Sequence, residues 1–195
     1  MGCDQRIPCG GEGRPAGTLL DKAALRREMS ARRRALDPLD KTRYDAAICE
    51  RLLQWWEGAR PRSVAVYWPL KGEPDIGPAC ARLQALGVQL VLPVVVARDA
   101  ALEFAEWIPG EEMIKDEMGV AVPAHARMAP QPQAVVIPCL GFNAGRFRLG
   151  YGGGYYDRTL EATPRPMTVG VAYSFAQVEF ETGTHDVALD LIITE

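Results

Sequence analysis

The chain has 195 residues, of which 48% are hydrophobic, and its 22 basic and 25 acidic side chains leave a net charge of −3. This length fits one domain, and the high apolar content with so small a net charge excludes a mainly disordered chain. No stretch approaches the roughly 18 consecutive apolar residues of a membrane helix, and residues 1–18 lack the apolar region of a secretory signal. We therefore expect a cytoplasmic protein without a membrane partner.

The cysteines and the charges narrow the function further. None of the five cysteines forms a C-x-x-C pair and the two histidines lie 60 residues apart, so neither a zinc site nor a disulfide framework is indicated. Residues 21–62 carry a net charge of +4 and the remainder −7. A basic segment on an acidic body suits a compact anion such as a polyphosphate better than a long nucleic acid. We interpret Arg32, Arg33 and Arg34 as a solvated helix face.

The order of helical and strand periodicities predicts an α/β fold. Residues 1–18 are rich in Gly and Pro and predict a disordered leader, followed by one domain over residues 19–195. The expected elements are helices at 21–36, 40–56, 76–86 and from about 155, and strands at 64–68, 88–96, 102–107, 134–137, 168–172 and 189–193. We expect Asp40 to cap the second helix, residues 111–118 to form an acidic loop or helical turn, and Pro93 to place its strand at an edge or a bulge. Val-rich and Ile-rich strands alternating with helices predict a layered domain with a mostly parallel sheet.

The strongest local signal is the segment Arg148–Arg158, which reads RLGYGGGYYDR. Four glycines in five positions between a strand and a helix let backbone amides approach an anionic ligand closely. The segment is neither a Walker A loop, since no Gly-Lys-Ser/Thr is present, nor G-x-G-x-x-G, since Tyr155 stands where the third glycine belongs. The glycines could also form a simple turn. Arg148 favours the ligand-binding interpretation because it can hold phosphate oxygens, and Asp157 because it can hold Mg²⁺ on those phosphates.

The same segment resembles the signature of the 5-formyltetrahydrofolate cyclo-ligase family, also called 5,10-methenyltetrahydrofolate synthetases. Three more segments are similar to that family: the Lys-x-x-x-Arg element Lys22–Arg26, the segment Tyr67–Glu73 with Asp75, and the carboxy-terminal run from His185 to Glu195. The resemblance covers about residues 20–195, in order and with family-like spacing. It implies a single three-layer α/β/α domain with a mostly parallel sheet, similar to the ribose-phosphate isomerase and CoA-transferase folds.

The resemblance also assigns roles to individual residues. The implied ATP-binding residues are Lys22, Arg26, Arg148, Leu149, Gly150, Tyr151, Gly152, Gly153, Gly154, Tyr155 and Tyr156. The implied substrate-binding residues are Trp68, Glu73, Tyr151, Gly152, Gly153, Gly154 and Tyr155. Arg148 and Tyr155 would be catalytic, and Asp157 and Asp190 would bind Mg²⁺. Two positions depart from the family pattern: Asn143 replaces a common Asp and keeps a capping role without the charge, and Gly153 replaces a Lys found in some members.

The activity implied by the resemblance is the ATP- and Mg²⁺-dependent cyclisation of 5-formyltetrahydrofolate to 5,10-methenyltetrahydrofolate, with release of ADP and phosphate. The reaction would pass through a phosphorylated formyl group, so no cysteine or serine nucleophile is needed. One alternative is a non-catalytic paralogue that only binds folate or nucleotide. A nucleic-acid-binding protein using the arginines of 26–34 is disfavoured by the pI of about 5.5 and the absence of an aromatic-basic motif. We expect a monomer without a nucleic-acid partner.

Overall fold

The computed structural model describes residues 21–70, 72–116 and 119–195, and the expected leader at 1–18 lies outside these residues. Its helices are α1 (Lys22–Arg34), α2 (Pro38–Ala59), α3 (Gly77–Ala85), α4 (Tyr155–Leu160) and a 3₁₀ turn at Ser174–Ala176. Its strands are β1 (Ser63–Ala65), β2 (Gln89–Val94), β3 (Glu103–Glu106), β4 (Met113–Lys115), β5 (Ala121–Pro123), β6 (Met128–Ala129), β7 (Ala134–Pro138), β8 (Gly141–Phe142), β9 (Arg148–Leu149), β10 (Met167–Val171) and β11 (Leu191–Ile193).

A seven-stranded sheet forms the centre of the molecule, in the order β11-β10-β7-β1-β2-β3-β6. The five strands from β11 to β2 pair in parallel, and β3 and β6 add an antiparallel edge. The small pairs β4–β5 and β8–β9 lie outside this sheet. The mostly parallel sheet predicted from the sequence is therefore confirmed.

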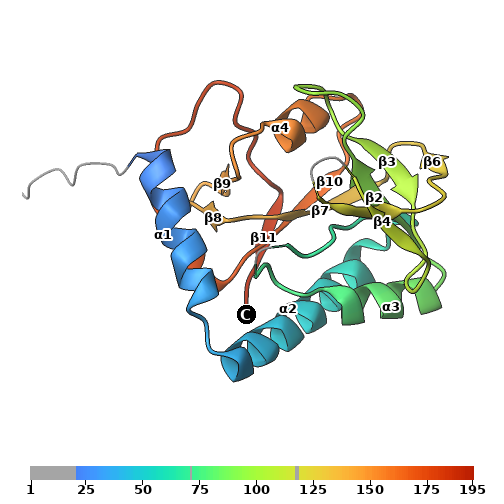
Figure 1. Cartoon of the computed structure of the whole chain (residues 1–195), viewed down its shortest axis with the longest axis horizontal. Helices are drawn as coiled ribbons and strands as arrows, with labels where there is room; N and C mark the ends of the chain where they lie inside the picture. The colour runs from blue at the N-terminus through green and yellow to red at the C-terminus, as the bar shows by residue number, and fades with distance from the viewer. Residues whose placement is uncertain (1–20, 71, 117–118) are drawn as a thin grey trace, which may run out of the picture.

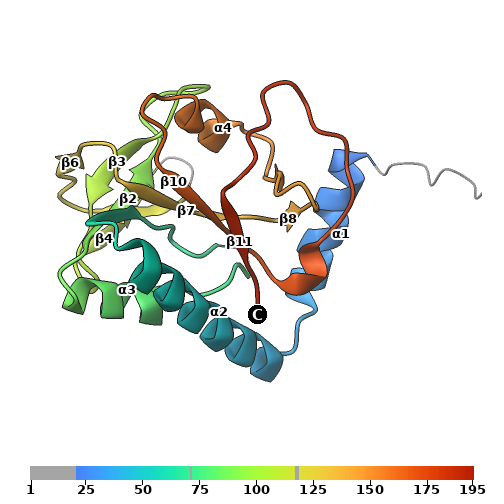
Figure 2. The ribbon, with the colours of Figure 1, turned by 180° about the vertical axis from the view of Figure 1, so that it is seen from behind.

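The sheet is covered on both faces, which makes three layers. Helices α2 and α3 lie along one face, where Leu52 and Leu83 pack against Val64, Val136 and Val169. Helices α1 and α4 contribute Met29 and Leu160 to the second cluster, which packs on the other face (Figures 1 and 2). Strands buried on both sides need apolar residues at successive positions, which explains the runs of Val and Ile.

Local sequence explains where the first two helices begin and end. Asp21 is the N-cap of α1, and Asp37 caps α2 by accepting hydrogen bonds from the amides of Leu39 and Asp40. The expectation that Asp40 is the cap was wrong, because Pro38 starts the helix at its first position, where its missing amide costs no hydrogen bond. Asp40 instead lies in the first turn.

Two other expectations were wrong. Pro93 lies in β2, which has neighbours on both sides, so its strand is not an edge. However, the pairing of β2 with β1 ends at Val91. Pro93 lies beyond it, where its missing backbone amide costs no hydrogen bond to β1. Residues 113–115, expected in an acidic loop or helical turn, form β4 and pair with β5. Among the described helices, none is both long and apolar enough to cross a lipid bilayer.

Candidate active site

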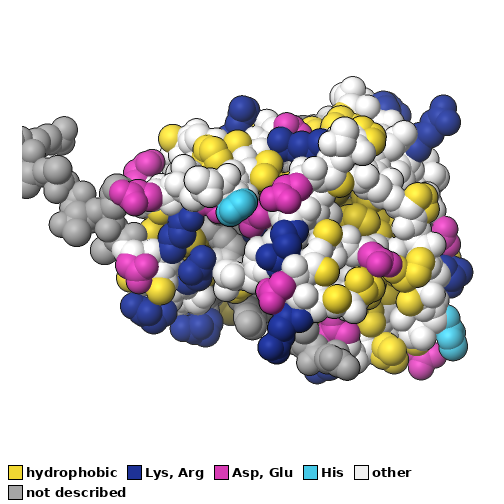
Figure 3. Space-filling view, turned by 90° about the horizontal axis from the view of Figure 1, so that it is seen from above, with side chains coloured by type: hydrophobic (Ala, Val, Ile, Leu, Met, Phe, Trp, Pro, Cys, Tyr) yellow, Lys and Arg dark blue, Asp and Glu magenta, His cyan; other side chains and the backbone are white. Residues whose placement is uncertain are grey.

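A pocket of about 240 Å³ lies where α1, the carboxyl end of β7 and the glycine-rich segment meet. It is lined by Lys22, Arg26, Pro138, the whole run 148–157 and Asp186. The carboxyl edge of a parallel sheet is the usual place for a ligand in an α/β fold. From above, Figure 3 shows basic and acidic side chains interspersed on this face, and hydrophobic ones gathered towards the end of the molecule that holds β2 and β3.

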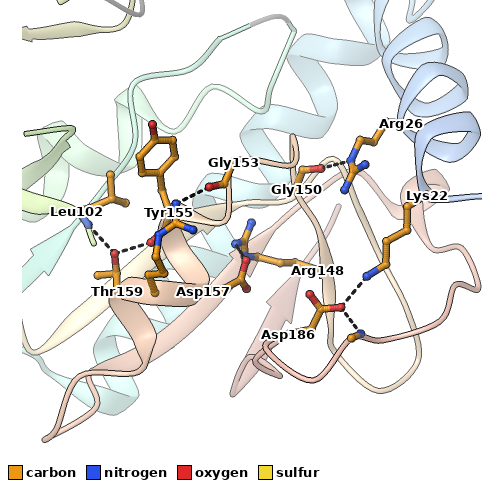
Figure 4. A network of polar contacts seen from close by, with 12 residues as sticks. Lys22, Arg26, Leu102, Arg148, Gly150, Gly153, Tyr155, Asp157, Thr159 and Asp186 are labelled. Carbon is orange, nitrogen blue, oxygen red and sulfur yellow. Dashed lines mark hydrogen bonds and ion pairs between the residues drawn. The ribbon is translucent and has the colours of Figure 1, made fainter. Parts of the chain in front are cut away.

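Helix α1 supplies cations to this pocket because its polar and apolar residues follow helical spacing. Leu25 and Met29 are buried and fix which side of the helix faces the domain. Lys22 and Arg26, one turn apart, lie close to that side, so both side chains reach the pocket. The Arg26 Nε atom donates a hydrogen bond to the Gly150 carbonyl oxygen at 2.8 Å, which anchors the glycine-rich loop to the helix (Figure 4).

Arg148 is the most deeply placed cation of the pocket. Its side chain is 7% exposed, and one guanidinium nitrogen donates to Asp157 Oδ2 at 2.7 Å. The guanidinium also lies over the ring of Tyr156, 5.2 Å from the ring centre. Arg148 Nε has no hydrogen-bond partner among the residues that the structure describes. A buried cation whose donors are not all used is suited to hold an anion.

The backbone of the glycine-rich loop explains why glycine occurs there. Gly152 and Gly154 have φ angles of 100° and 65°, a region that side chains with a Cβ atom rarely adopt. The φ angle of Gly153 lies outside this region, but a Cβ atom there would come within 2.9 Å of the Tyr155 ring. Substitution would therefore strain the loop at Gly152 or Gly154 and displace a pocket side chain at Gly153.

A second pocket, of about 550 Å³, lies next to the first and is lined by two tryptophans. Trp68 and Trp107 line it with their rings edge to face, 6.1 Å apart, and Glu73 lines it with a side chain that is 3% exposed. Glu73 Oε2 accepts a hydrogen bond from the Leu70 amide at 2.9 Å, which fixes the direction of the carboxylate. This arrangement suits a flat ring system with N–H donors along one edge.

The two pockets are joined by the side chain of Tyr151. Its hydroxyl donates to Glu73 Oε1 at 2.9 Å, and it accepts a hydrogen bond from Arg33 Nη1 at 3.0 Å. Because Tyr151 lines the first pocket and Glu73 the second, ligands in the two pockets would lie on either side of this contact. Burial raises the pKa of the Tyr151 hydroxyl, and the nearby Glu73 carboxylate raises it further, so the hydroxyl stays a donor at neutral pH.

Comparison with known proteins identifies the family. The sequence profile of the 5-formyltetrahydrofolate cyclo-ligase family matches residues 19–195. The chain belongs to the 5-formyltetrahydrofolate cyclo-ligase family. It is therefore an enzyme, a cyclo-ligase, and the family predicted from four sequence segments is confirmed.

Relatives and solved structures agree with this assignment. A 5-formyltetrahydrofolate cyclo-ligase of Mycoplasma pneumoniae is 31% identical and aligns with 90% of this chain and 99% of its own length. One from Escherichia coli is 28% identical over 73% of this chain and 81% of the relative. The solved 5,10-methenyltetrahydrofolate synthetase of Mycoplasma pneumoniae superimposes with a TM-score of 0.76 at 29% identity, covering 90% of this chain and 99% of that structure. The synthetase of Aquifex aeolicus gives a TM-score of 0.76 at 26% identity, with 88% of each chain covered.

The structure brings most of the residues implied by the family together. All eleven expected ATP-binding residues line the first pocket, and Trp68 and Glu73 line the second. Tyr155, expected to be catalytic, lies in the first pocket with the Arg158 guanidinium 5.3 Å from its ring centre. Asn143 Oδ1 accepts a hydrogen bond from the Phe147 amide at 3.0 Å, as expected for a structural cap. Their roles in binding and catalysis remain predictions.

The two carboxylates expected to hold Mg²⁺ are not brought together. Asp157 lines the first pocket, whereas Asp190 Oδ2 accepts hydrogen bonds from the amide and the hydroxyl of Thr168, both at 2.8 Å. Thr168 is level with Val135 in the sheet, three residues before the end of β7, which is about 10 Å along the strand. Within the described ranges, no three His, Cys, Asp or Glu residues gather as a metal-binding cluster.

Sequence reasoning gave no role in the site to Asp186, Trp107 or Arg33. Asp186 lines the same pocket as Asp157, and Figure 4 shows the Arg148 side chain reaching between these two carboxylates. Trp107, which directly follows β3, lines the second pocket, and nothing in the local sequence indicated this. Arg33, expected on a solvated face, is buried, so that expectation was wrong. The signal was present: Leu25, Met29 and Arg33 follow one another at intervals of four, which continues the buried stripe of the helix.

Proposed function

We propose that this chain cyclises 5-formyltetrahydrofolate to 5,10-methenyltetrahydrofolate with ATP and Mg²⁺, releasing ADP and phosphate through a phosphorylated formyl group. The observation that carries the proposal is the pair of adjoining pockets, one cationic with a glycine-rich loop and one aromatic with a buried carboxylate, joined through Tyr151. A reaction between a triphosphate and a flat ring system requires such a juxtaposition.

The first pocket is our proposed nucleotide site. A triphosphate carries several negative charges, and Lys22, Arg26 and Arg148 converge on the pocket. Gly152 and Gly154 have positive φ angles that glycine adopts without strain, and without a Cβ atom their backbone can come close to phosphate oxygens. Strand β9 precedes the loop and the short helix α4 follows it directly.

The second pocket is our proposed folate site. The pteridine ring of a folate is flat and carries neighbouring N–H donors, which a fixed carboxylate accepts in pairs. Glu73 is such a carboxylate, because its side chain is buried and one oxygen is already oriented by the Leu70 amide. Trp68, 36% exposed, and Trp107, 8% exposed, offer aromatic surface to the ring.

The residues of the nucleotide pocket fit a magnesium ion carried on ATP. Carboxylate oxygens are the protein ligands that Mg²⁺ prefers, usually one or two of them together with phosphate oxygens. Asp157 is our proposed ligand, and Asp186 is the second carboxylate that lines the same pocket. Asp190 remains a ligand implied by the family resemblance, although its carboxylate is bonded to Thr168. When bound, the ion would neutralise charge on the phosphates.

The proposed chemistry asks the protein for positioning and charge compensation. The formyl oxygen of the substrate is a poor leaving group, so the γ-phosphoryl group is first transferred to it and ADP is released. N10 then attacks the formyl carbon and loses its proton, the C–O bond breaks, and the oxygen departs with phosphate. Lys22, Arg26 and Arg148 would stabilise the charge on the phosphoryl group during transfer.

A direct assay tests the proposal. The purified chain is incubated with 5-formyltetrahydrofolate, ATP and Mg²⁺ while the absorbance of the methenyl product and the release of phosphate are followed. We expect both signals in a ratio of one to one, and neither when ATP is omitted or when EDTA is added. Binding of both ligands without product would favour the non-catalytic paralogue instead.

A further inference from the structure

The guanidinium of Arg33 lies at the junction of the two pockets and is completely buried. Its side chain is 0% exposed, although it sits between Arg32 and Arg34, both exposed residues of the same helix. Removing a cation from water is costly, so such a group persists where partners compensate it. The position of Arg33 is therefore set by what it contacts.

Arg33 contacts one element from each pocket and the strand between them. Nη1 donates to the Tyr151 hydroxyl at 3.0 Å and lies 4.0 Å from Glu73 Oε1, and Nη2 donates to the Cys139 carbonyl oxygen. Cys139 directly follows Pro138, which ends β7 and lines the first pocket. One rigid guanidinium thus fixes the glycine-rich loop, the Glu73 carboxylate and the end of β7 relative to one another.

The order of these hydrogen bonds indicates how a ligand in one pocket would affect the other pocket. Tyr151 accepts from Arg33 and donates to Glu73, so the three groups form a polarised chain from cation to carboxylate. A ring bound at Glu73 would shield Tyr151, the member of this chain that is 46% exposed, and strengthen its hydrogen bonds to the two buried partners. Tyr151 would then be held more firmly, and with it the adjoining loop that contains the positive-φ positions Gly152 and Gly154.

We propose that Arg33 is a positioning residue that couples the two pockets, so that occupancy of the aromatic pocket increases the affinity of the cationic pocket for nucleotide. This inference rests on the proposed function for the identity of the two ligands. Coupling of binding sites is reciprocal, so nucleotide increases the affinity for folate by the same factor. We expect a factor of about 5 or more, the lower end of the usual range for coupled sites.

The coupling factor can be measured by calorimetry on the full chain. The Kd of a nonhydrolysable ATP analogue with Mg²⁺ is determined with and without saturating 5-formyltetrahydrofolate, and the ratio of the two values is the coupling factor. Tyr151→Phe removes the bridging hydroxyl with little change in shape, and Arg33→Lys keeps the charge but loses the planar fork. We expect both variants to bring the factor close to 1. For Arg33→Lys, whose residue lines neither pocket, we also expect the Kd of the analogue alone to change by less than about threefold.

Arg32→Lys is the matched control. The Arg32 guanidinium lies over the Phe175 ring, 4.7 Å from its centre, and its residue is exposed on the same helix. We expect this variant to keep the wild-type coupling factor. If Arg33 had only a structural role, Arg33→Lys would lower the melting temperature and leave the coupling factor unchanged.

The outcomes separate the two proposals. If the wild-type chain binds neither ligand, the proposed function is wrong and this inference falls with it. If it binds both with a factor near 1, or if Tyr151→Phe and Arg33→Lys keep the wild-type factor, the function stands and the coupling role of Arg33 is wrong. Should Arg33→Lys fail to fold, Tyr151→Phe decides the question alone.

Discussion

The ammonium group of Lys22 lies 2.7 Å from Oδ2 of Asp186, a residue 164 positions later in the chain. The same carboxylate oxygen accepts a hydrogen bond from the Gly183 amide at 2.8 Å, so the carboxy-terminal loop is held by the first turn of α1 (Figure 4). Partial burial alone would raise the pKa of Asp186, but the hydrogen bonds from Lys22 and Gly183 outweigh it and lower the pKa below its usual value.

This lowered pKa predicts a pH dependence of stability. A carboxyl group with a lowered pKa in the folded state stabilises the protein above its unfolded pKa of about 4, and this contribution is lost as the pH falls through the folded value. Because the pair is partly exposed, we expect Asp186→Asn to cost about 0.5–1 kcal/mol of unfolding free energy at pH 7 and much less at pH 3. Urea unfolding at both pH values measures the difference. Lys22→Met serves as the control and should give the same pH dependence, whereas an equal cost at both values would show that the charge does not matter.

The two aspartates implied as metal ligands are predicted to behave differently. Asp157→Asn should lower turnover by about 10²-fold or more and weaken binding of MgATP, because Asp157 lines the nucleotide pocket and orients Arg148. Asp190→Asn should instead lower the unfolding free energy by about 1–3 kcal/mol, since its charged hydrogen bonds to Thr168 join β10 to the start of β11. Steady-state kinetics at varied Mg²⁺ and urea unfolding separate the two effects. A Mg²⁺ requirement shifted equally in both variants would place Asp190 at the metal.

The glycine-rich loop predicts a loss of activity without a loss of fold. Gly153→Val should keep the circular dichroism spectrum and lower turnover by about 10²-fold or more, because its side chain would displace the Tyr155 ring. Gly152→Ala should cost about 1 kcal/mol of strain, given its φ angle of 100°. Gly58→Ala is the control, since an added Cβ atom there meets nothing within 4 Å and the position is helical. That variant should gain about 0.5–1 kcal/mol with unchanged turnover. Normal turnover of Gly153→Val would mean that the loop is only a turn.

Burial predicts that the thiol of Cys80 is unreactive in the folded chain. Burial, together with the neighbouring Cys49 and Asp75, raises the pKa of the Cys80 thiol to about 12. Since the thiolate is the reactive form, alkylation at pH 8 should be slower than for a free thiol by about 10³-fold or more. Mass spectrometry of the labelled peptide after timed exposure to iodoacetamide measures this rate, with denatured protein as the reference. Rapid labelling in the native state would show that the aromatic pocket opens to Cys80.

Much of the fold was predictable because its long elements carry clear periodicity. The continuous apolar run Ala134–Ile137 indicated a doubly buried strand, and the stripe through Ile48 and Leu52 indicated an amphipathic helix. The strands β6, β8 and β9 have two residues each, too few for an alternating pattern to appear. Their positions are determined by pairing with distant segments, which local sequence does not encode.

The site was predictable where a side chain acts within a local motif, and less so where its role depends on packing. The loop from Arg148 to Asp157 is continuous in sequence and remains continuous in the pocket. Arg33 looks like its two arginine neighbours, and only the packing of α1 against the sheet determines which of the three is buried. Asp186 and Asp190 are both carboxylates of one terminal segment, and their different partners could not be distinguished before the fold was known.

Helix α1 contributes to the site from the beginning of the chain, whereas its partners come from the end. Arg26 binds the Gly150 carbonyl oxygen, Arg33 the Cys139 carbonyl oxygen and Lys22 the Asp186 carboxylate, over separations of 124, 106 and 164 residues. During synthesis on the ribosome, α1 therefore emerges well before these partners and cannot make the three contacts until they have been translated. At about 5–20 residues per second, its apolar stripe waits roughly 10 to 30 seconds for these partners. Throughout that interval Leu25 and Met29, which are buried in the folded chain, lie open to solvent or to a chaperone that shields emerging chains.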